Sequence, residues 1–401
     1  MRYCLFEDSE VNNFNPIVLT KHLSGVFVGA YTQFERLKKF ITSNSNIILF
    51  GREYLSGIYD DIAPYFSNSK SVPNSIFINS KVFLSNELFS SFPLSNNWVI
   101  TQDQVIIAFN VDEEVMQLIV NSNFDFKVIN SLKNQQIIDS SLYKIYSYLW
   151  DLIEDNSNAI SYDRKFFIDK STNKFNEIYK VNEKDILIGE DCKIGCGVIL
   201  DASSGVILIG NNVSIMHNSV IVGPCFIGDN SVIKIGAKIY ENTSIGKNCK
   251  IGGEVENSII IGYSNKQHDG FLGHSYIGEW VNIGADTNTS DLKNNYGEIK
   301  VQLNNKTVNT GRLLLGSIIG DHSKTSINTM LNTGTIVGVF ANIFGSNFPS
   351  KNIKSFAWGL DENFKFRKED AIQLAKIVMK RRKIDASENY LKLIDYLYEQ
   401  L

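Results

Sequence analysis

The feature that most constrains this chain is a six-residue spacing of aliphatic residues in its second half. Isoleucine recurs at eight successive positions spaced by six: Ile209, Ile215, Ile221, Ile227, Ile233, Ile239, Ile245 and Ile251. A period of six fits neither the 3.6-residue turn of an α-helix nor the two-residue period of a lone strand, and it is the hexapeptide repeat of a parallel β-helix. Residues 185–345 are therefore predicted to form a β-helix, left-handed as in known hexapeptide solenoids.

The spacing is interrupted twice and then resumes. Phe271, Ile277 and Ile283 are predicted to restore it, as are Ile319, Thr325, Leu331, Val337 and Ile343. The spacing fails over 258–270 and over 288–314, where we expect loops, which often carry function. The second interruption alternates apolar and polar residues, so it is predicted to contain a short hairpin.

Ordinary globular patterns flank the repeat. Residues 1–160 are predicted to form a mixed α/β domain, 161–184 a linker and 346–401 a helical tail. Strands are expected at 2–6, 46–51 and 75–79, a hairpin at 98–109, and helices at 28–41, 368–384 and 385–401. The spacing of Asp385 and Glu388 predicts a capping box at the start of the last helix.

Charge and composition exclude some classes of partner. The 39 basic and 43 acidic residues give a net charge of −4, which offers no reason to expect nucleic acid or an anionic membrane. No stretch approaches the roughly 20 apolar residues that span a bilayer, and the start lacks an apolar signal core, so a cytoplasmic protein is expected. The five cysteines form no CxxC pair, which predicts reduced thiols.

Long strings of the chain resemble one enzyme family. The strings in the second half are "LDASSG" (200–205), "GGEVENSIIIGYSNKQHDGFLGHSYIGEWVNIGADT" (252–287) and "IIGDHSKTSINTMLNTGTIVG" (318–338). Those in the first half are "LFED" (5–8), "PIVLTKHLSGVFVGAYTQFERL" (16–37) and "YLWDLIEDN" (148–156). By these motifs the chain resembles the GlmU-like bifunctional N-acetylglucosamine-1-phosphate uridyltransferase and glucosamine-1-phosphate N-acetyltransferase, in its shorter, divergent Bacteroidetes-type form. The resemblance implies a sugar nucleotidyltransferase domain before the β-helix.

The resemblance also implies an acetyltransferase site on the β-helix. His268 falls on the catalytic histidine of the family, Asn282 on the asparagine that contacts the substrate amine, and Ala285 on the alanine beside the acetyl group. A histidine whose pKa lies near neutrality can take the proton of the amine as it attacks acetyl-CoA. By the same spacing His274 matches no functional position and is expected to be structural.

Two departures from the family leave the sugar phosphate without its usual contacts. Phe271 replaces a tyrosine, and residues 257–258 replace a lysine pair, so Lys266, Lys293 or Lys234 is expected to hold the phosphate, or the acceptor is a different sugar. The predicted substrate-binding residues are Lys266, Phe271, Ala285, Lys293, Tyr296 and His322. The basic cluster 380–383 is either a solvated helix face or a contact to the phosphates of a nucleotide-like cofactor.

The first domain lacks the expected glycine-rich phosphate loop. In its place Thr20, Lys21 and Gly25 are predicted to contact a nucleotide, with Lys21 where the divergent subfamily usually has arginine. Asp103 and Asp151 are candidate ligands for Mg²⁺. Either this domain is an active uridyltransferase, or it is a degenerate domain kept for substrate binding or assembly.

The predicted function is sugar-nucleotide biosynthesis. Acetyl-CoA would acetylate an amino-sugar 1-phosphate, glucosamine 1-phosphate above all, and UTP would then give UDP-N-acetylglucosamine. The resemblance implies a homotrimer with the acyl site between neighbouring solenoids. Two alternatives stay open: a nucleotidyltransferase for another sugar 1-phosphate with a purely structural β-helix, and a non-catalytic binding or scaffold protein.

Overall fold

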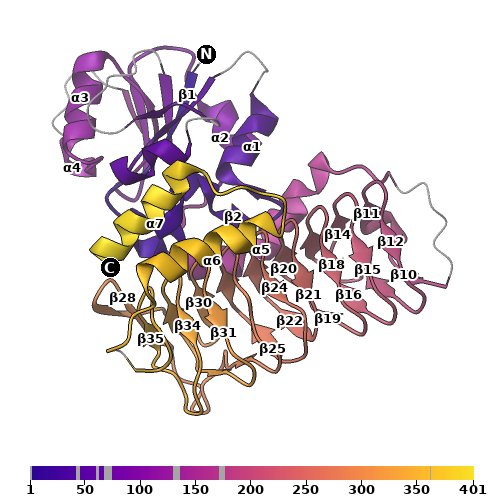
Figure 1. Ribbon diagram of the computed structural model, residues 1–401. Helices are drawn as coiled ribbons and strands as arrows, with labels where there is room; N and C mark the ends of the chain where they lie inside the picture. The colour runs from indigo at the N-terminus through magenta and orange to yellow at the C-terminus, as the bar shows by residue number, and fades with distance from the viewer. Residues whose placement is uncertain are drawn as a thin grey trace.

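The computed structural model describes residues 2–41, 46–59, 63–66, 75–129, 136–170, 177–361 and 363–401. Figure 1 shows an α/β domain lying on one side of a long solenoid, with two C-terminal helices packed against both. No helix in these ranges is long and apolar enough to cross a membrane.

The first domain is built on one seven-stranded sheet. Its strand order is β5-β4-β1-β6-β8-β7-β9. The bounds are β1 Arg2–Phe6, β4 Asn46–Phe50, β5 Tyr65–Phe66, β6 Ser75–Asn79, β7 Trp98–Gln102, β8 Val105–Asn110 and β9 Gln136–Asp139. Strands β5, β4, β1 and β6 run parallel, and β8 is antiparallel to β6. The three predicted strands and the predicted hairpin are confirmed, although β4 ends at Phe50.

Five helices accompany this sheet in the described part of the domain. They are α1 Gln33–Phe40, α2 Asn86–Ser91, α3 Glu113–Asn121, α4 Phe126–Ile129 and α5 Leu149–Asp163. The helix predicted over 28–41 was placed too early, because β2 Phe27–Val28 and β3 Tyr31–Thr32 pair as a small hairpin before it. Gly29 has a φ of 69° in this hairpin, and a Cβ there would lie 2.5 Å from an oxygen of Asp163. Thr32 then caps α1 through the N–H of Glu35, so the helix begins at Gln33.

The second half is a parallel β-helix with three faces, as predicted. The domain-side face faces the first domain and contains β11 Ile186–Ile188, β14 Ile207–Ile209, β17 Cys225–Ile227, β20 Thr243–Ile245, β23 Ile259–Ile260, β26 Tyr276–Ile277, β30 Ser317–Ile319, β33 Thr335–Val337 and β35 Asn352–Ile353. The helix-side face contains β12 Lys193–Ile194, β15 Ser214–Ile215, β18 Val232–Ile233, β21 Lys250–Ile251, β24 Asn265–Lys266, β31 Lys324–Thr325 and β34 Asn342–Ile343. The open face contains β10 Tyr179–Val181, β13 Ile199–Asp201, β16 Val220–Val222, β19 Lys238–Ile239, β22 Glu254–Glu256 and β25 Phe271–Gly273, and β27 Asn288–Thr289 and β32 Met330–Leu331 follow in later coils.

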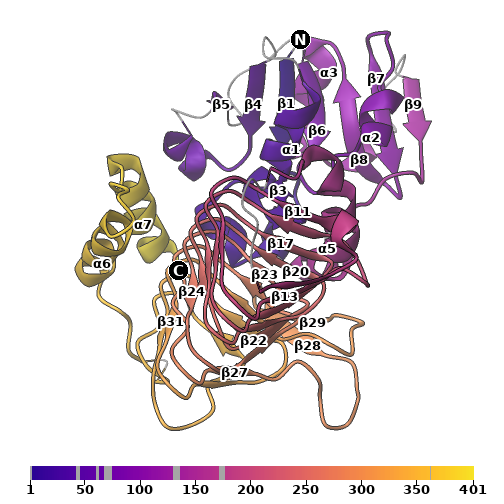
Figure 2. The same ribbon diagram turned by 90° about the vertical axis from the view of Figure 1, so that its right-hand side faces the viewer.

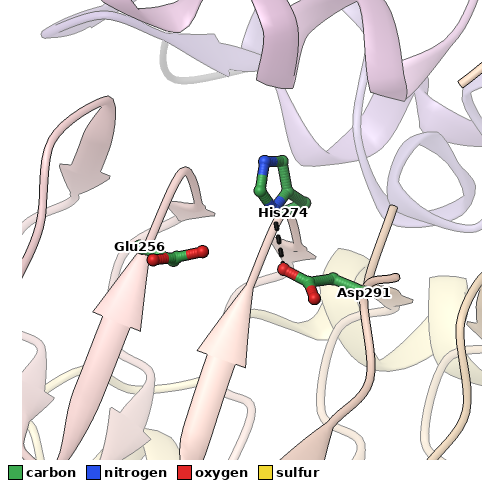
Figure 3. Close-up of side chains that lie close together, drawn as sticks. All are labelled: Glu256, His274 and Asp291. Carbon is green, nitrogen blue, oxygen red and sulfur yellow. Dashed lines mark hydrogen bonds and ion pairs between the residues drawn. The ribbon is translucent and has the colours of Figure 1, made fainter. Parts of the chain in front are cut away.

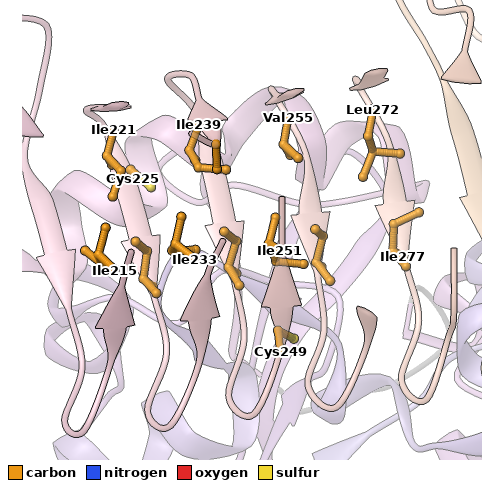
Figure 4. Close-up of a cluster of buried hydrophobic side chains, with 14 of the residues drawn as sticks. Ile215, Ile221, Cys225, Ile233, Ile239, Cys249, Ile251, Val255, Leu272 and Ile277 are labelled. Carbon is orange, nitrogen blue, oxygen red and sulfur yellow. The ribbon is translucent and has the colours of Figure 1, made fainter. Parts of the chain in front are cut away.

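The isoleucines of the six-residue spacing fill the inside of the solenoid. Ile215, Ile233 and Ile251 stack on successive coils, and each is almost completely buried (Figure 4). Burial of this kind contributes about 25 cal/mol for each Å² of apolar surface removed from water. The spacing therefore identified the core correctly through this run.

The first interruption of the spacing is a shortening of the coil and not a loop. Ile227 pairs with Ile245, which lies eighteen positions later in the sequence. Ile245 pairs with Ile260, which lies only fifteen positions later. The expected loop over 258–270 was wrong, because the stretch holds β23 and β24. The shortening also shifts the register, so that Leu272 and not Phe271 points inside.

The second interruption does leave the solenoid. Residues 291–315 lie between β27 and β30 and contain β28 Lys300–Leu303 and β29 Lys306–Asn309, paired as an antiparallel hairpin. The predicted hairpin is confirmed.

One corner of the solenoid changes its chemistry along the axis. At the turn from the domain-side to the helix-side face, one residue per coil has a left-handed backbone conformation. Early coils use Asp191, Asn212, Asn230 and Asn248 there, and later coils use Tyr263, Trp280, His322, Phe340 and Phe356. Neighbouring rings of the later set lie 4.3 to 5.9 Å apart between centroids and are nearly parallel. We call the two sets the amide ladder and the aromatic ladder.

Two tail helices cover the later coils. They are α6 Lys368–Lys380 and α7 Glu388–Gln400, and Figure 2 shows both beside the solenoid. The predicted capping box at Asp385 was wrong, since the Ser387 side chain accepts the N–H of Tyr390 and starts α7. Asn389 donates to the carbonyl of Gly57, so α7 also contacts the first domain.

The predicted domain limits stay predictions. Helix α5 runs through residue 160, β10 precedes residue 185, and β35 extends the solenoid past residue 345. Residues 171–176 of the predicted linker lie outside the described residues.

The domain-side face of the solenoid is buried against the first domain. Tyr276 exchanges hydrogen bonds with the backbone of Phe27, and Ser244 donates to the carbonyl of Gly29. Phe226 and Leu208 belong to the same apolar cluster as residues of β2 and α5. This packing fixes the first domain on the solenoid and leaves the helix-side face free for α6.

Candidate active site

A groove of about 360 Å³ lies between α6 and the helix-side face. Its lining residues are Lys250, Tyr263, Asn265, Gln267, Trp280, Asn282, Lys324, Leu374, Val378, Arg381 and Arg382. The floor follows from strand register, because Lys250, Asn265, Asn282 and Lys324 are paired in successive coils. Side chains at paired positions point to the same side of a sheet, so these four face outward together.

The groove is positively charged. Lys250, Lys324, Arg381 and Arg382 line it, and none of its lining residues is acidic. Arg382 donates to the side-chain oxygen of Asn265 at 2.9 Å. Burial lowers the pKa of Lys324 to about 8, so protonation of this lysine is sensitive to what binds beside it. A groove of this charge suits an anionic ligand, because Lys and Arg form charge-assisted hydrogen bonds with phosphate.

His268 lies at an exposed corner beside the groove, one residue after Gln267. The neighbouring Lys266 points inward, in register with Ile251, and is 2% exposed. Its Nζ donates to the carbonyls of Gly252 and His268, at 3.0 and 3.1 Å, and burial lowers its pKa to about 8. Lys266 therefore holds the backbone beneath His268, and a contact to substrate remains a prediction.

The other predicted substrate residues near this corner lie in turns. The N–H of Phe271 donates to the side chain of Asn288, and the carbonyl of Ala285 accepts the N–H of Asn328. Ala285 is half-buried and lies three residues after Asn282, in the next turn of the same coil. The structure thus brings Asn282 into the groove and leaves Phe271 on the open face.

Lys293 and Tyr296 lie in the second interruption, away from α6. Lys293 donates to the carbonyl of Glu298 at 2.9 Å, and Tyr296 is 71% exposed. Neither lines the groove. Their predicted contact to substrate would need a second surface, such as that of a neighbouring chain.

His322 is a member of the aromatic ladder and not of the groove surface. Its ring stacks on Phe340 at 4.5 Å, and its Nε2 lies 2.9 Å from the hydroxyl of Tyr390. Burial, Lys324 and Lys21 lower its pKa well below the usual value, so His322 is neutral near pH 7. A neutral, buried ring supports packing, and its predicted contact to substrate remains a prediction.

A second hollow of about 400 Å³ lies at the carboxyl ends of β1 and β4 in the first domain. Strands β1 and β4 are parallel neighbours, and ligands of open α/β sheets bind outside the carboxyl ends of the strands. The hollow contains Glu7, Asp8, Arg52 and Glu53. Arg52 donates to both carboxylate oxygens of Glu7, at 2.9 and 2.8 Å. Although burial opposes its charge, His22 and Arg52 lower the pKa of Glu7 to about 2.

The predicted nucleotide residues face the solenoid. Thr20 donates to Asp321 at 2.5 Å, and Lys21 pairs with Asp321 and, at 3.5 Å, with Glu279. Although burial opposes its charge, these two carboxylates raise the pKa of Lys21. Gly25 packs beside Lys21 and the Tyr59 hydroxyl. These contacts join the two domains, and a role in nucleotide binding remains a prediction.

The predicted magnesium ligands lie on separate elements. Asp103 lies in the exposed turn between β7 and β8, with a φ of 48°. Asp151 accepts backbone N–H groups at the start of α5 and pairs with Arg312 at 3.2 Å. Neither belongs to a group of three His, Cys, Asp or Glu side chains that could hold a metal, as far as the chain is described.

Comparison with known proteins agrees with this two-part architecture. Residues 3–172 match the family model described as sugar nucleotidyl transferase, and residues 224–256 match bacterial transferase hexapeptide (six repeats). Residues 3–172 are therefore similar to sugar nucleotidyl transferases, and they precede a solenoid that contains hexapeptide repeats.

Two curated proteins to which this chain is similar carry names that describe them as bifunctional. One, a bifunctional sugar-1-phosphate nucleotidylyltransferase/acetyltransferase of Sulfurisphaera tokodaii, is 34% identical over 29% of this chain and 28% of that protein. Bifunctional protein GlmU of Wigglesworthia glossinidia brevipalpis is 33% identical over 41% of this chain and 32% of that protein. The chain thus spans about a third of their length. A solved UDP-N-acetylglucosamine acyltransferase of Campylobacter jejuni is 13% identical with a TM-score of 0.28, over 56% of this chain and 96% of that one.

Sequence reasoning missed most of the groove. Lys250 and Lys324 each directly precede an inward residue of the helix-side face, so the spacing could have shown that they share a face. It could not show that α6 covers this face. The basic cluster 380–383 had two open interpretations, and the structure places Arg381 and Arg382 in the groove.

Proposed function

We propose that the solenoid transfers the acetyl group of acetyl-CoA to the amine of an amino-sugar 1-phosphate, with glucosamine 1-phosphate as the first candidate. The observation that carries this proposal is the groove, which unites four cations with Asn282 and contains no acid. Both substrates carry phosphates, so such a groove favours them. The names of the two curated relatives support the same chemistry.

In this proposal the amine nitrogen attacks the thioester carbon, and the carbon–sulfur bond breaks as the oxyanion collapses. His268 accepts the proton that the amine loses, and the thiolate of CoA leaves and is protonated from solvent. Asn282 contacts the amine, and the backbone N–H of Ala285 donates to the developing oxyanion. No covalent intermediate on the protein is needed.

A groove on a single solenoid offers only one wall for a substrate. We therefore propose that the chain works as a homotrimer, in which a neighbouring solenoid brings further residues to His268. The predicted substrate contacts of Lys293 and Tyr296 fit a site that is shared with a neighbouring solenoid, because Tyr296 is exposed and Lys293 is half-buried. Acetyl-CoA and UTP as substrates favour the cytoplasm as the place of action.

Uridylyl transfer with Mg²⁺ is the second candidate function, favoured by the family match of residues 3–172. The hollow at the ends of β1 and β4 would hold the nucleotide. Its cation Arg52 is already paired with Glu7, and Lys81 beside it is paired with Asp8 at 2.8 Å. Binding of a triphosphate would therefore have to open these pairs, which makes acetyl transfer the better supported of the two functions.

Two assays of the full chain test these functions separately. Thiol release from acetyl-CoA with glucosamine 1-phosphate reports acetyl transfer, and pyrophosphate release from UTP with N-acetylglucosamine 1-phosphate reports uridylyl transfer. His268→Ala is expected to lower kcat of thiol release about 10²–10⁴-fold. The matched control is His217→Ala, because His217 is exposed two residues after Ile215, as His268 is after Lys266.

Each outcome decides between the functions. No thiol release by the wild-type chain, or full activity of His268→Ala, overturns the acetyl-transfer proposal. Pyrophosphate release alone would indicate a nucleotidyltransferase with a structural solenoid. Silence in both assays would indicate a binding or scaffold protein.

A further inference from the structure

A cluster of one histidine and two carboxylates lies at a different corner of the solenoid from the groove. Glu256 ends β22, His274 follows β25, and Asp291 follows β27, so three successive coils contribute (Figure 3). The potential ligand atoms of the three side chains all lie within 4.8 Å of one another. His274 Nδ1 and Asp291 Oδ2 are 2.7 Å apart.

The strand register leaves a space for this cluster. Glu256 is paired with Gly273 on the neighbouring coil. A Cβ on Gly273 would lie only 2.4 Å from Asp291 Oδ2. The carboxylate of Asp291 therefore occupies the space that a side chain at position 273 would fill. It faces strand β22, which ends at Glu256.

Further acidic residues lie beside the cluster. Glu241 and Glu254 lie close enough to Glu256 to act on it electrostatically, and Lys238 already pairs with Glu254 at 3.3 Å. Burial, more than these acids, raises the pKa of Glu256, while His274 opposes the rise. Two half-buried carboxylates beside further acids are stabilised by a cation between them.

We propose that Glu256, His274 and Asp291 bind a divalent transition-metal cation such as Zn²⁺. An imidazole nitrogen and carboxylate oxygens are ligands that zinc accepts, and three protein ligands leave a fourth position open. Zinc bound at Nδ1 requires the ring proton of His274 on Nε2, so zinc takes the place of the hydrogen bond between Nδ1 and Asp291 Oδ2, and these two atoms separate to about 3.3 Å, as tetrahedral bonds of about 2.0–2.1 Å require. The side chains of His274 and Asp291 are 16% and 14% exposed, so an ion can enter from solvent. The site does not depend on the proposed acetyl transfer.

Calorimetric titration of the chelator-treated full chain with ZnCl₂ tests the proposal. One ion per chain is expected, and Co²⁺ at the same site is expected to give the intense visible absorption of a four-coordinate ion. His274→Asn is the sharpest variant, because Asn257 and Asn242 hold the corresponding left-handed position in the preceding coils and preserve the backbone. It should weaken zinc binding more than about tenfold, or 1.4 kcal/mol.

Glu256→Gln and Asp291→Asn should each weaken binding in the same way, and His217→Asn, at an exposed corner histidine, should leave it unchanged. Circular dichroism of each variant confirms that the fold is retained. Absence of zinc binding by the wild-type chain, unchanged affinity of His274→Asn, or loss of binding in His217→Asn would each overturn the proposal.

Discussion

The two ladders occupy the same corner of the same solenoid with different side chains. In the early coils Asn212, Asn230 and Asn248 have φ values of 53°, 60° and 58°. In the later coils His322, Phe340 and Phe356 hold nearly the same conformation, with φ values of 61°, 57° and 58°. The backbone is the same at both ends, and only the covering differs, because α6 and α7 pack over the later coils.

The difference shows what determines the residue at a left-handed position. Residues other than Gly, Asn and Asp pay roughly 1–2 kcal/mol for this conformation. Phe340 and Phe356 are buried, and stacked rings gain about 0.5–1.5 kcal/mol beyond the area they bury. At a covered corner these gains exceed the backbone cost, whereas at an open corner an amide is the better solution.

The largest effect is expected from removing one ring of the aromatic ladder. Phe340→Ala should cost about 3–5 kcal/mol, because it leaves a cavity between His322 and Phe356. In the amide ladder, Asn230→Ala should cost only about 1–2 kcal/mol, because alanine is less stable than asparagine in the left-handed backbone conformation. Unfolding in urea measures both. Equal costs would mean that the covering helices do not stabilise the ladder.

Loss of the ion pair beside the aromatic ladder should have the next largest effect. Lys21→Met leaves Asp321 buried without its cation and should cost about 3 kcal/mol. Asp321 keeps its hydrogen bonds from Thr20 and the N–H of Glu279, so the cost should not be larger. Lys193→Met, at an exposed lysine of the early coils, is the control. A change below 1 kcal/mol in Lys21→Met, measured by urea unfolding, would show that this pair does not hold the domains together.

The ladders should also differ in their response to pH. Burial lowers the pKa of His322, so the folded chain keeps it neutral while the unfolded chain protonates it below about pH 6.5. The stabilisation that comes from a neutral His322 is therefore fully present above about pH 6.5. As the pH falls below that value, the free energy of unfolding decreases by up to about 1.4 kcal/mol per pH unit. His322→Phe should flatten this slope, and the slope that remains includes His22, whose pKa burial also lowers. Urea midpoints at several pH values measure the slope. Identical slopes in the wild-type chain and in His322→Phe would contradict a neutral His322.

The smallest effect on stability is expected at the groove beside the aromatic ladder. Arg382→Ala removes one half-buried hydrogen bond to Asn265 and should change stability by about 0.5–1.5 kcal/mol. Binding of acetyl-CoA, measured by calorimetry, should weaken about tenfold, because a charged donor to phosphate is lost. Lys380→Ala is the control, since Lys380 is exposed on α6 outside the lining of the groove. Equal affinity in the two variants would remove Arg382 from the ligand site.

Regular spacing made the solenoid predictable, and changes in coil length limited the prediction. Ile215 to Ile251 were assigned to the core because each coil there has eighteen residues. From Ile245 onward a shorter coil shifted the inward position from Phe271 to Leu272. The coil is two residues short where Ile239 pairs with Val255 and three short where Ile245 pairs with Ile260, so two corners contribute, and the spacing cannot reveal which corners are shortened.

The site was predictable only in the part that follows the repeat. Asn282 was assigned from the resemblance to the family motif, and the structure puts it in the groove. The partners of Lys21 were not predictable, because Asp321 is three hundred residues away in sequence and meets Lys21 only when the domains pack. His274 matched no functional position by spacing, and its proximity to Glu256 and Asp291 appears only when three coils are stacked.

Because Arg381 and Arg382 close a groove whose floor is formed by residues 250–324, the site is assembled from parts made at different times. During synthesis on a ribosome the solenoid coils can stack while α6 and α7 are still inside the exit tunnel. The groove is completed only after the tail has emerged and the side chain of Asn389 has formed its hydrogen bond to the carbonyl of Gly57. The order of translation therefore delays ligand binding until the first domain, the solenoid and the tail helices have come together.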